Sequence, residues 1–204
     1  MRTLICLALA ACTSATASPP TGAVRTVGTF HGLDIATVID VDVTIGPVAR
    51  VELRGPTDWV AKISTQVKDG VLRISLPSDV NHVPKLSAVI TMPGLTSVAV
   101  SGVAGVHVAK LAATTLEVAI SGVGSVDLAG TADTLHVDVS GTGQLMAKDL
   151  TTSTTTLDVA GSGEATIRAT KEVDANVSGV GDVTILGKPA TIHKHVSGVA
   201  EIHD

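Results

Sequence analysis

The second half of the chain alternates apolar and polar residues around a turn of small residues that returns about every 19 positions. Each turn starts with Ser-Gly or, once, with Ala-Gly; the starts are Ser101, Ser121, Ser140, Ala160, Ser178 and Ser197. On both sides of these turns, Val, Ile, Leu or Ala occupies most alternate places, and polar or small residues lie between them. An alternation of period two predicts β-strands that bury one face.

Glycine holds the second place of the turn in all six copies: Gly102, Gly122, Gly141, Gly161, Gly179 and Gly198. A place that never carries a side chain indicates a tight corner or a positive φ angle. We therefore predict that these six glycines are structural turn residues.

A strand, a glycine corner and a second strand, repeated at one period, predict coils that stack on one another. The predicted fold is all-β: a parallel β-helix of about six coils over residues 95–204. With neighbouring coils about 4.8 Å apart, six coils make a rod roughly 29 Å long. The alternative is an antiparallel sandwich, but sandwiches rarely keep one period and one corner through six copies.

Residues 27–94 are predicted to form an N-terminal cap and the first coils, because an uncovered first coil would expose unpaired strand edges. Alternation predicts strands at residues 30–35, 39–45, 51–53 and 86–92. Lys68-Asp69-Gly70 predicts a tight turn between strands at 63–67 and 71–76. Thr57 is predicted to cap a short helix that reaches Ile63.

The first residues combine a positive charge with a short apolar run, which is typical of an export signal. Two cleavage sites are open. Leu9-Ala10-Ala11-Cys12 resembles a bacterial lipoprotein box, in which Cys12 is lipidated and residues 1–11 are removed. Ala15-Thr16-Ala17 instead predicts a signal over residues 1–17. Residues 18–26, with Pro19-Pro20, are predicted to be a flexible tether.

Composition excludes some classes of function. The 204 residues are 45% hydrophobic but only 1% aromatic, and the net charge is -5. Nucleic-acid binding usually needs aromatic platforms and a basic face, so we expect no nucleic-acid partner. Cys6 leaves with either signal, so no pair of thiols remains for a disulfide. We predict no cofactor.

Four features in this order resemble the putative auto-transporter adhesin family with a head GIN domain: residues 30–35 (FHGLDI), residues 67–74 (VKDGVLRI), residues 92–95 (MPGL) and the Ser-Gly-x-Gly repeats. The resemblance covers residues 27–204. It implies a right-handed parallel β-helix on a bacterial cell-envelope protein, and no catalytic residues. It also suggests side-by-side homo-oligomers and an envelope or cell-surface partner.

The serine column does not predict a hydrolase, because it lacks the Gly-x-Ser-x-Gly elbow and five equivalent hydroxyls suit turn chemistry. Outward columns hold the candidates for a cation site. Asp138 and Asp158 are predicted to lie side by side, where like charges repel unless a cation or proton separates them. His193 and His195 form an i, i+2 pair that suits a transition metal. For both pairs a solvated surface is the preferred interpretation, so no metal is predicted.

The sequence therefore favours an exported, non-enzymatic β-helix that acts as an adhesin-like or structural module of the bacterial envelope. It would lie in the periplasm, on the outer membrane or cell surface, or outside the cell, with a lipid on Cys12 as its one membrane contact. The alternative is a polysaccharide lyase or hydrolase that uses an acidic strip of Asp138, Asp158 and Asp174. Arg168, the only arginine in the repeat, lies on another segment.

Overall fold

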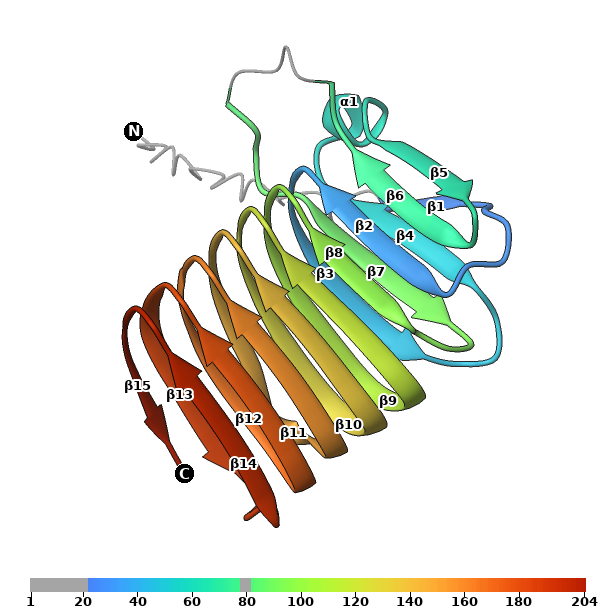
Figure 1. The fold of residues 1–204 in the computed structure, drawn as a ribbon. Helices are drawn as coiled ribbons and strands as arrows, with labels where there is room; N and C mark the ends of the chain where they lie inside the picture. The colour runs from blue at the N-terminus through green and yellow to red at the C-terminus, as the bar shows by residue number, and fades with distance from the viewer. Residues whose placement is uncertain (1–21, 78–81) are drawn as a thin grey trace, which may run out of the picture.

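The repeat folds as parallel strands in which each coil hydrogen-bonds to the next (Figure 1). The structure is a computed structural model that describes residues 22–77 and 82–204. The predicted all-β parallel β-helix is confirmed. Its repeat strands are β8 (Ser97–Val100), β9 (Val103–Ile120), β10 (Val123–Val139), β11 (Thr142–Val159), β12 (Ser162–Val177), β13 (Val180–Leu186), β14 (Thr191–Val196) and β15 (Val199–His203).

Each long strand turns around the stack and so contributes to both of its sides. The first half of β9 pairs with β3 (Val38–Ile45), whereas its second half pairs with β8. The same division continues at the other end, where β13 and β14 pair with the two halves of β12. We call the two sides the β3 side and the β2 side, after β2 (Gly32–Ala36), which pairs with β8.

The inward columns form one aliphatic core. Three places before each turn, Val98, Val118, Val137, Leu157 and Ala175 are all buried. Among the described residues, three polar side chains are buried: Thr37 between β2 and β3, and Thr152 and Thr155 on β11, whose hydroxyls bond to each other at 2.8 Å. Lys194 breaks the same column in the last coil. It is exposed there, and its Nζ lies 2.6 Å from Oδ1 of Asp204, so the charge is paired rather than buried.

The Ser-Gly corner is a ladder of backbone hydrogen bonds between coils. The residue after each glycine donates its N–H to the glycine carbonyl of the previous coil, as Thr142 does to Gly122 at 3.0 Å. A Cβ on Gly141 would collide with that same carbonyl oxygen, and a Cβ on Gly161 would collide with the carbonyl of Gly141. The glycine column therefore exists because successive corners touch backbone to backbone.

Positive φ, which the sequence offered as one reason for these glycines, is not that reason. None of the six corner glycines has a φ in the left-handed region. Positive φ occurs at the opposite corner of the coils instead, at Lys110 (60°), Gly130 (139°) and Gly187 (96°). Glycine is therefore required at the Ser-Gly corner by close backbone contacts, whereas positive φ angles occur at the opposite corner.

Residues 22–96 build one further coil and a cap. The elements not yet placed are β1 (Gly22–Arg25), β4 (Arg50–Arg54), α1 (Thr57–Val60), β5 (Ser64–Lys68), β6 (Val71–Ser75) and β7 (Ser87–Met92). β2 and β3 form a coil whose corner lies at Thr37, and its carbonyl accepts the N–H of Val103 at 3.1 Å. The β2–β3 coil is therefore a further coil of the stack. It lacks the Ser-Gly pair, so the sequence pattern did not reveal it.

The order of coils in space differs from their order in the chain. β6 pairs with β2, and β7 pairs with β3, so these two strands lie on the far side of the β2–β3 coil from the repeat. The chain then returns across that coil to start β8. Antiparallel strands complete this end, with β5 on β6, and with β4 and then β1 on β7 (Figure 1).

Three local predictions in this region had different outcomes. The hairpin is confirmed: Asp69 and Gly70 have φ angles of 52° and 75°, which suit a two-residue turn between β5 and β6. Thr57 is the first residue of α1 rather than its cap, because Pro56 holds the extended N-cap place without a side-chain bond. The tether is wrong for Gly22–Arg25, since these residues pair with β4.

The predicted export signal, Cys12 and residues 18–21 of the tether lie outside the described residues. In residues 22–77 and 82–204, no helix has the length and apolar character needed to span a bilayer.

The corner contacts predict opposite outcomes for neighbouring substitutions. We expect Gly141→Val to lower the free energy of unfolding by about 3 kcal/mol, because its side chain would force two coils apart. Ser140→Ala should change it by less than about 0.5 kcal/mol, since that side chain is exposed. Thermal unfolding of both variants measures the difference, and equal losses would mean that the corners do not touch.

Candidate functional site

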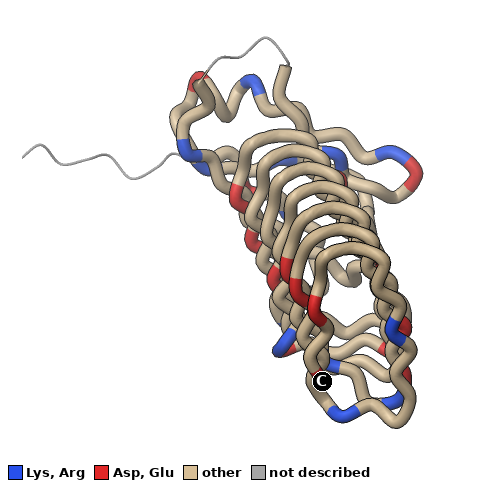
Figure 2. Tube along the Cα trace, turned by 60° about the vertical axis from the view of Figure 1, so that its left-hand side comes forward, with Lys and Arg blue, Asp and Glu red and all other residues tan. Residues whose placement is uncertain are grey.

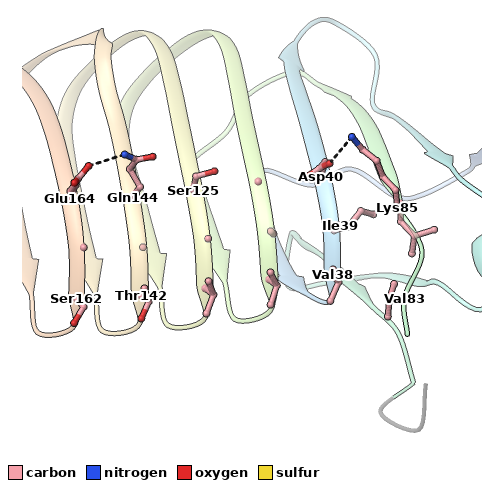
Figure 3. Close-up of a pocket in the computed structure, with 18 of the residues that line it drawn as sticks. Val38, Ile39, Asp40, Val83, Lys85, Ser125, Thr142, Gln144, Ser162 and Glu164 are labelled. Atoms are coloured by element: carbon pink, nitrogen blue, oxygen red, sulfur yellow. Dashed lines mark hydrogen bonds and ion pairs between the residues drawn. The ribbon is translucent and has the colours of Figure 1, made fainter. Parts of the chain in front are cut away.

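A groove with a volume of about 860 Å³ runs along the β3 side, just after the Ser-Gly corners. It crosses the β2–β3 coil and the first halves of β9, β10, β11 and β12. We call it the corner groove. Figure 3 shows its lining, which repeats from one coil to the next because the strands are in register.

One wall of the corner groove is a column of exposed side chains, one per coil. Val38, Val103 and Val123 come first and are 43%, 50% and 53% exposed. Thr142 and Ser162 continue the column with hydroxyl groups. Valine is normally drawn into a core, so three consecutive exposed valines form an apolar surface that the fold does not need.

Within the repeat, the floor has almost no side chains. It is formed by Ile39 of β3 and then by the small residues two places after each corner glycine: Ala104, Gly124, Gly143 and Gly163. A Cβ on Gly143 would lie 2.8 Å from Cγ2 of Ile120, and one on Gly163 would collide with the carbonyl of Gly143. The same close stacking that requires glycine at the corner therefore hollows the surface beside it.

The opposite wall is polar. Asp40, Ser125, Gln144 and Glu164 follow one another on successive strands, with Gly105 in the same column between Asp40 and Ser125 (Figure 3). Gln144 donates from Nε2 to Oε2 of Glu164 at 3.0 Å. The wall thus offers carboxylate, amide and hydroxyl groups opposite the valines.

A loop closes one end of the corner groove. Val83, Pro84, Lys85 and Leu86, which precede β7, line the groove there. The carbonyl of Leu86 accepts the N–H of Asp40 at 3.1 Å, and Nζ of Lys85 lies 3.8 Å from Oδ2 of Asp40 (Figure 3). This end therefore carries the one cation among the lining residues.

The acidic pair from the sequence lies on the β2 side, away from the corner groove. Asp138 and Asp158 are register partners on β10 and β11, as expected. Asn176, the next residue in the column, donates from Nδ2 to Oδ1 of Asp158 at 3.0 Å. Arg168 of the lyase hypothesis donates from Nε to the carbonyl of Lys148 at 2.7 Å. The structure does not test the preferred interpretation of the acidic pair as a solvated surface, nor its alternative, a bound cation.

The histidine pair is exposed on β14. His193 and His195 lie beside Asp174 and Asn176 of β12, and Nε2 of His193 is 4.0 Å from Oε1 of Glu172. Among the described residues, ligand atoms converge instead at Asp182, Glu201 and His203, all of which are exposed. Metal binding at His193 and His195, the alternative to a solvated pair, is likewise untested.

Acidic residues recur along one side of the coils, whereas Lys and Arg are sparse there (Figure 2). The outward column that starts with Asp40 becomes continuously acidic at Glu164, Asp182 and Glu201. Among the described residues, the one clear pKa shift lies elsewhere: a 2.8 Å hydrogen bond from Nε of Arg54 lowers the pKa of Glu52 on β4.

Two hydroxyls of the serine column, those of Ser101 and Ser178, contact backbone carbonyls, in keeping with a turn role. Oγ of Ser101 is 3.5 Å from the carbonyl of Ile35, and Oγ of Ser178 is 3.4 Å from that of Val159. Sequence reasoning missed the corner groove, although a signal was present. The place directly after each corner glycine is outward, yet Val103, Val123, Val180 and Val199 occupy it.

We expect Ca²⁺ to leave the Tm of the chain unchanged, because Asp158 already accepts the Asn176 amide and its charge is exposed to water. Thermal unfolding with and without millimolar Ca²⁺ checks this, with Asp158→Asn as the matched variant. A rise in Tm that Asp158→Asn abolishes would contradict the solvated interpretation.

Three solved structures share this architecture. A putative adhesin from Bacteroides fragilis NCTC 9343 is 26% identical with a TM-score of 0.72, over 92% of this chain and 97% of that one. A putative adhesin from Parabacteroides distasonis ATCC 8503 is 20% identical with a TM-score of 0.54, over 89% and 96%. A putative lipid binding protein from the same species and strain is 17% identical with a TM-score of 0.53, over 91% and 97%.

No curated protein sequence matches the chain. A family model does match, over residues 29–189, which include the β2–β3 coil, the cap and most of the repeat. The family expected from the order of sequence motifs is thereby confirmed. The chain belongs to the family described as putative auto-transporter adhesin, head GIN domain.

Proposed function

We propose that this chain is an exported, non-enzymatic binding module of the bacterial cell envelope, which attaches to a cell-surface partner along the corner groove. The observation that carries the proposal is the groove itself. The stack of coils exposes three valines in a row beside a polar wall, although exposed valines add nothing to the core. The family and the two adhesin-like structures support a binding role.

A groove of this kind suits an extended partner. It is open along its length, crosses five coils in register and has no deep pocket at which a reacting group would be enclosed. Its contacts would be van der Waals contacts to valine and hydrogen bonds to hydroxyl, amide and carboxylate groups. Repetition of weak contacts along a rod gives adhesion through many bonds rather than through one tight site.

Filling the groove should remove binding without harming the fold. In Ser125→Phe, the ring would project from the polar wall into the groove, so we expect retention of the chain on bacterial cells to fall about tenfold. Thr156→Phe, which points outward on the β2 side, is the matched control and should bind as the unmodified chain does. Flow cytometry with fluorescent chain measures both, and equal retention would contradict the assignment of the groove.

Export is tested at the N-terminus of the protein from its native host. We expect mass spectrometry to find residues 1–11 removed and a diacylglyceryl group on Cys12, or residues 1–17 removed and a free Ser18. A lipid on Cys12 would place the module on a membrane surface. A free Ser18 would mean that no lipid holds the module to the membrane. An intact Met1 would contradict export.

A further inference from the structure

Within the repeat, from Val103 onward, the exposed column beside the corner groove continues beyond the groove and reads the same from either end, while Val38 of β3 precedes it by one rung. From the first repeat to the last, the residue after the corner glycine is Val103, Val123, Thr142, Ser162, Val180 and Val199. Val180 and Val199 are 55% and 77% exposed, like the valines at the other end. Two apolar rungs therefore flank two hydroxyl rungs on each side. We call these six residues the valine edge.

The neighbouring outward column is not symmetric, because one half is uncharged and the other half is acidic. Two places further along each strand, the residues are Gly105, Ser125, Gln144, Glu164, Asp182 and Glu201. The first three are uncharged, and two of them carry hydrogen-bond donors. The last three are acidic. One half of the column thus complements the other half.

We propose that the partner of the valine edge is a second copy of this chain, docked antiparallel about a twofold axis between the rungs of Thr142 and Ser162. Val123 then faces Val180, and Val103 faces Val199, so apolar rungs meet apolar rungs. Thr142 faces Ser162. This inference rests on the proposed function and names its partner: adhesion is homotypic, between identical chains.

The polar column selects the antiparallel arrangement. With this axis, Glu164 faces Gln144, Asp182 faces Ser125 and Glu201 faces Gly105, so each of these three carboxylates meets a donor or an uncharged residue. Asp40, one rung before Gly105, lies outside the six facing rungs and is paired with Lys85. A parallel arrangement that keeps the valine edges in contact would move the two polar columns to opposite sides of that contact, so the carboxylates would lose these partners. A twofold contact is also self-limiting, because each surface is used once and no filament grows.

The contact between two chains is narrow, so we expect a single contact to be weak. Six rungs about 4.8 Å apart extend the valine edge over roughly 24 Å, with side chains from only two columns. Such a strip is smaller than a standard interface, so a single pair of chains binds weakly. Many chains on two opposed surfaces nevertheless bind firmly, because each bond that forms raises the effective concentration for the next.

Paired cysteines test the arrangement directly. In a full chain with Cys6→Ser and Cys12→Ser, we expect a mixture of Val123→Cys and Val180→Cys chains to form disulfide-linked dimers under mild oxidation. Val123→Cys alone should not, because in the antiparallel dimer its two copies are three rungs, about 14 Å, apart. Val48→Cys, 68% exposed and off the valine edge, is the control for random collision when mixed with Val123→Cys.

Dimers from Val123→Cys alone would mean a parallel contact and would overturn the proposal. A mixture that reacts no faster than the Val48→Cys control would overturn it as well. Neither result depends on refolding, since all three valines are exposed. Unchanged thermal unfolding of the reduced variants checks this.

Beads coated with the full chain test the function that follows. We expect unmodified beads to cluster, and clustering to fall about tenfold or more with Val123→Asp and Val180→Asp together, since avidity multiplies each weakened contact. Val48→Asp is the matched control. Beads that bind bacterial cells lacking this protein but do not cluster would refute the homotypic partner and leave the proposed function standing. Beads that do neither would refute both.

Discussion

The fold depends on the close approach of successive corners. The carbonyl of one corner glycine accepts a hydrogen bond from the next coil, and it occupies the space that a side chain on the next glycine would need. Because the coils touch there backbone to backbone, they stack in register and every outward position becomes a straight column. The hollow floor of the corner groove has the same origin, since Gly143 and Gly163 are held against neighbouring coils in the same way.

The sequence predicted what repeats and missed what does not. Period, alternation and the invariant glycine were sufficient for the parallel stack, because each reflects a contact made in every coil. The β2–β3 coil escaped notice because Thr37 stands at the glycine place. The side chain of Thr37 is buried there, and its carbonyl still accepts the N–H of Val103, so the backbone contact between corners is kept. The non-sequential order of coils leaves no periodic trace, because β6 and β7 pair with β2 and β3 on the side away from the repeat.

The site was harder to predict than the fold for a related reason. Packing restricts the residue types at inward and corner positions, so these positions show a clear pattern in the sequence. Outward positions are not restricted in this way. The sequence offered the carboxylates and histidines as candidate metal ligands. In the structure, however, Asp158 accepts a hydrogen bond from Asn176, and His193 is exposed. The residues that indicated a binding surface were the exposed valines directly after the corner glycines. Scaffold and surface are thus separate columns of one repeat, and the surface can change while the stack persists.

The most direct test of this account joins two corners that are 65 residues apart in the chain. Val38 and Val103 are register partners on adjacent coils, so cysteines placed at both should be cross-linked by a short bifunctional thiol reagent in the folded protein. Cysteines at Val103 and Val123, register partners within the repeat, are the positive control. Cross-linking of both pairs is the predicted result. If the control pair reacts and the Val38–Val103 pair does not, another coil separates them, and the stacking of the β2–β3 coil on the first repeat corner is wrong.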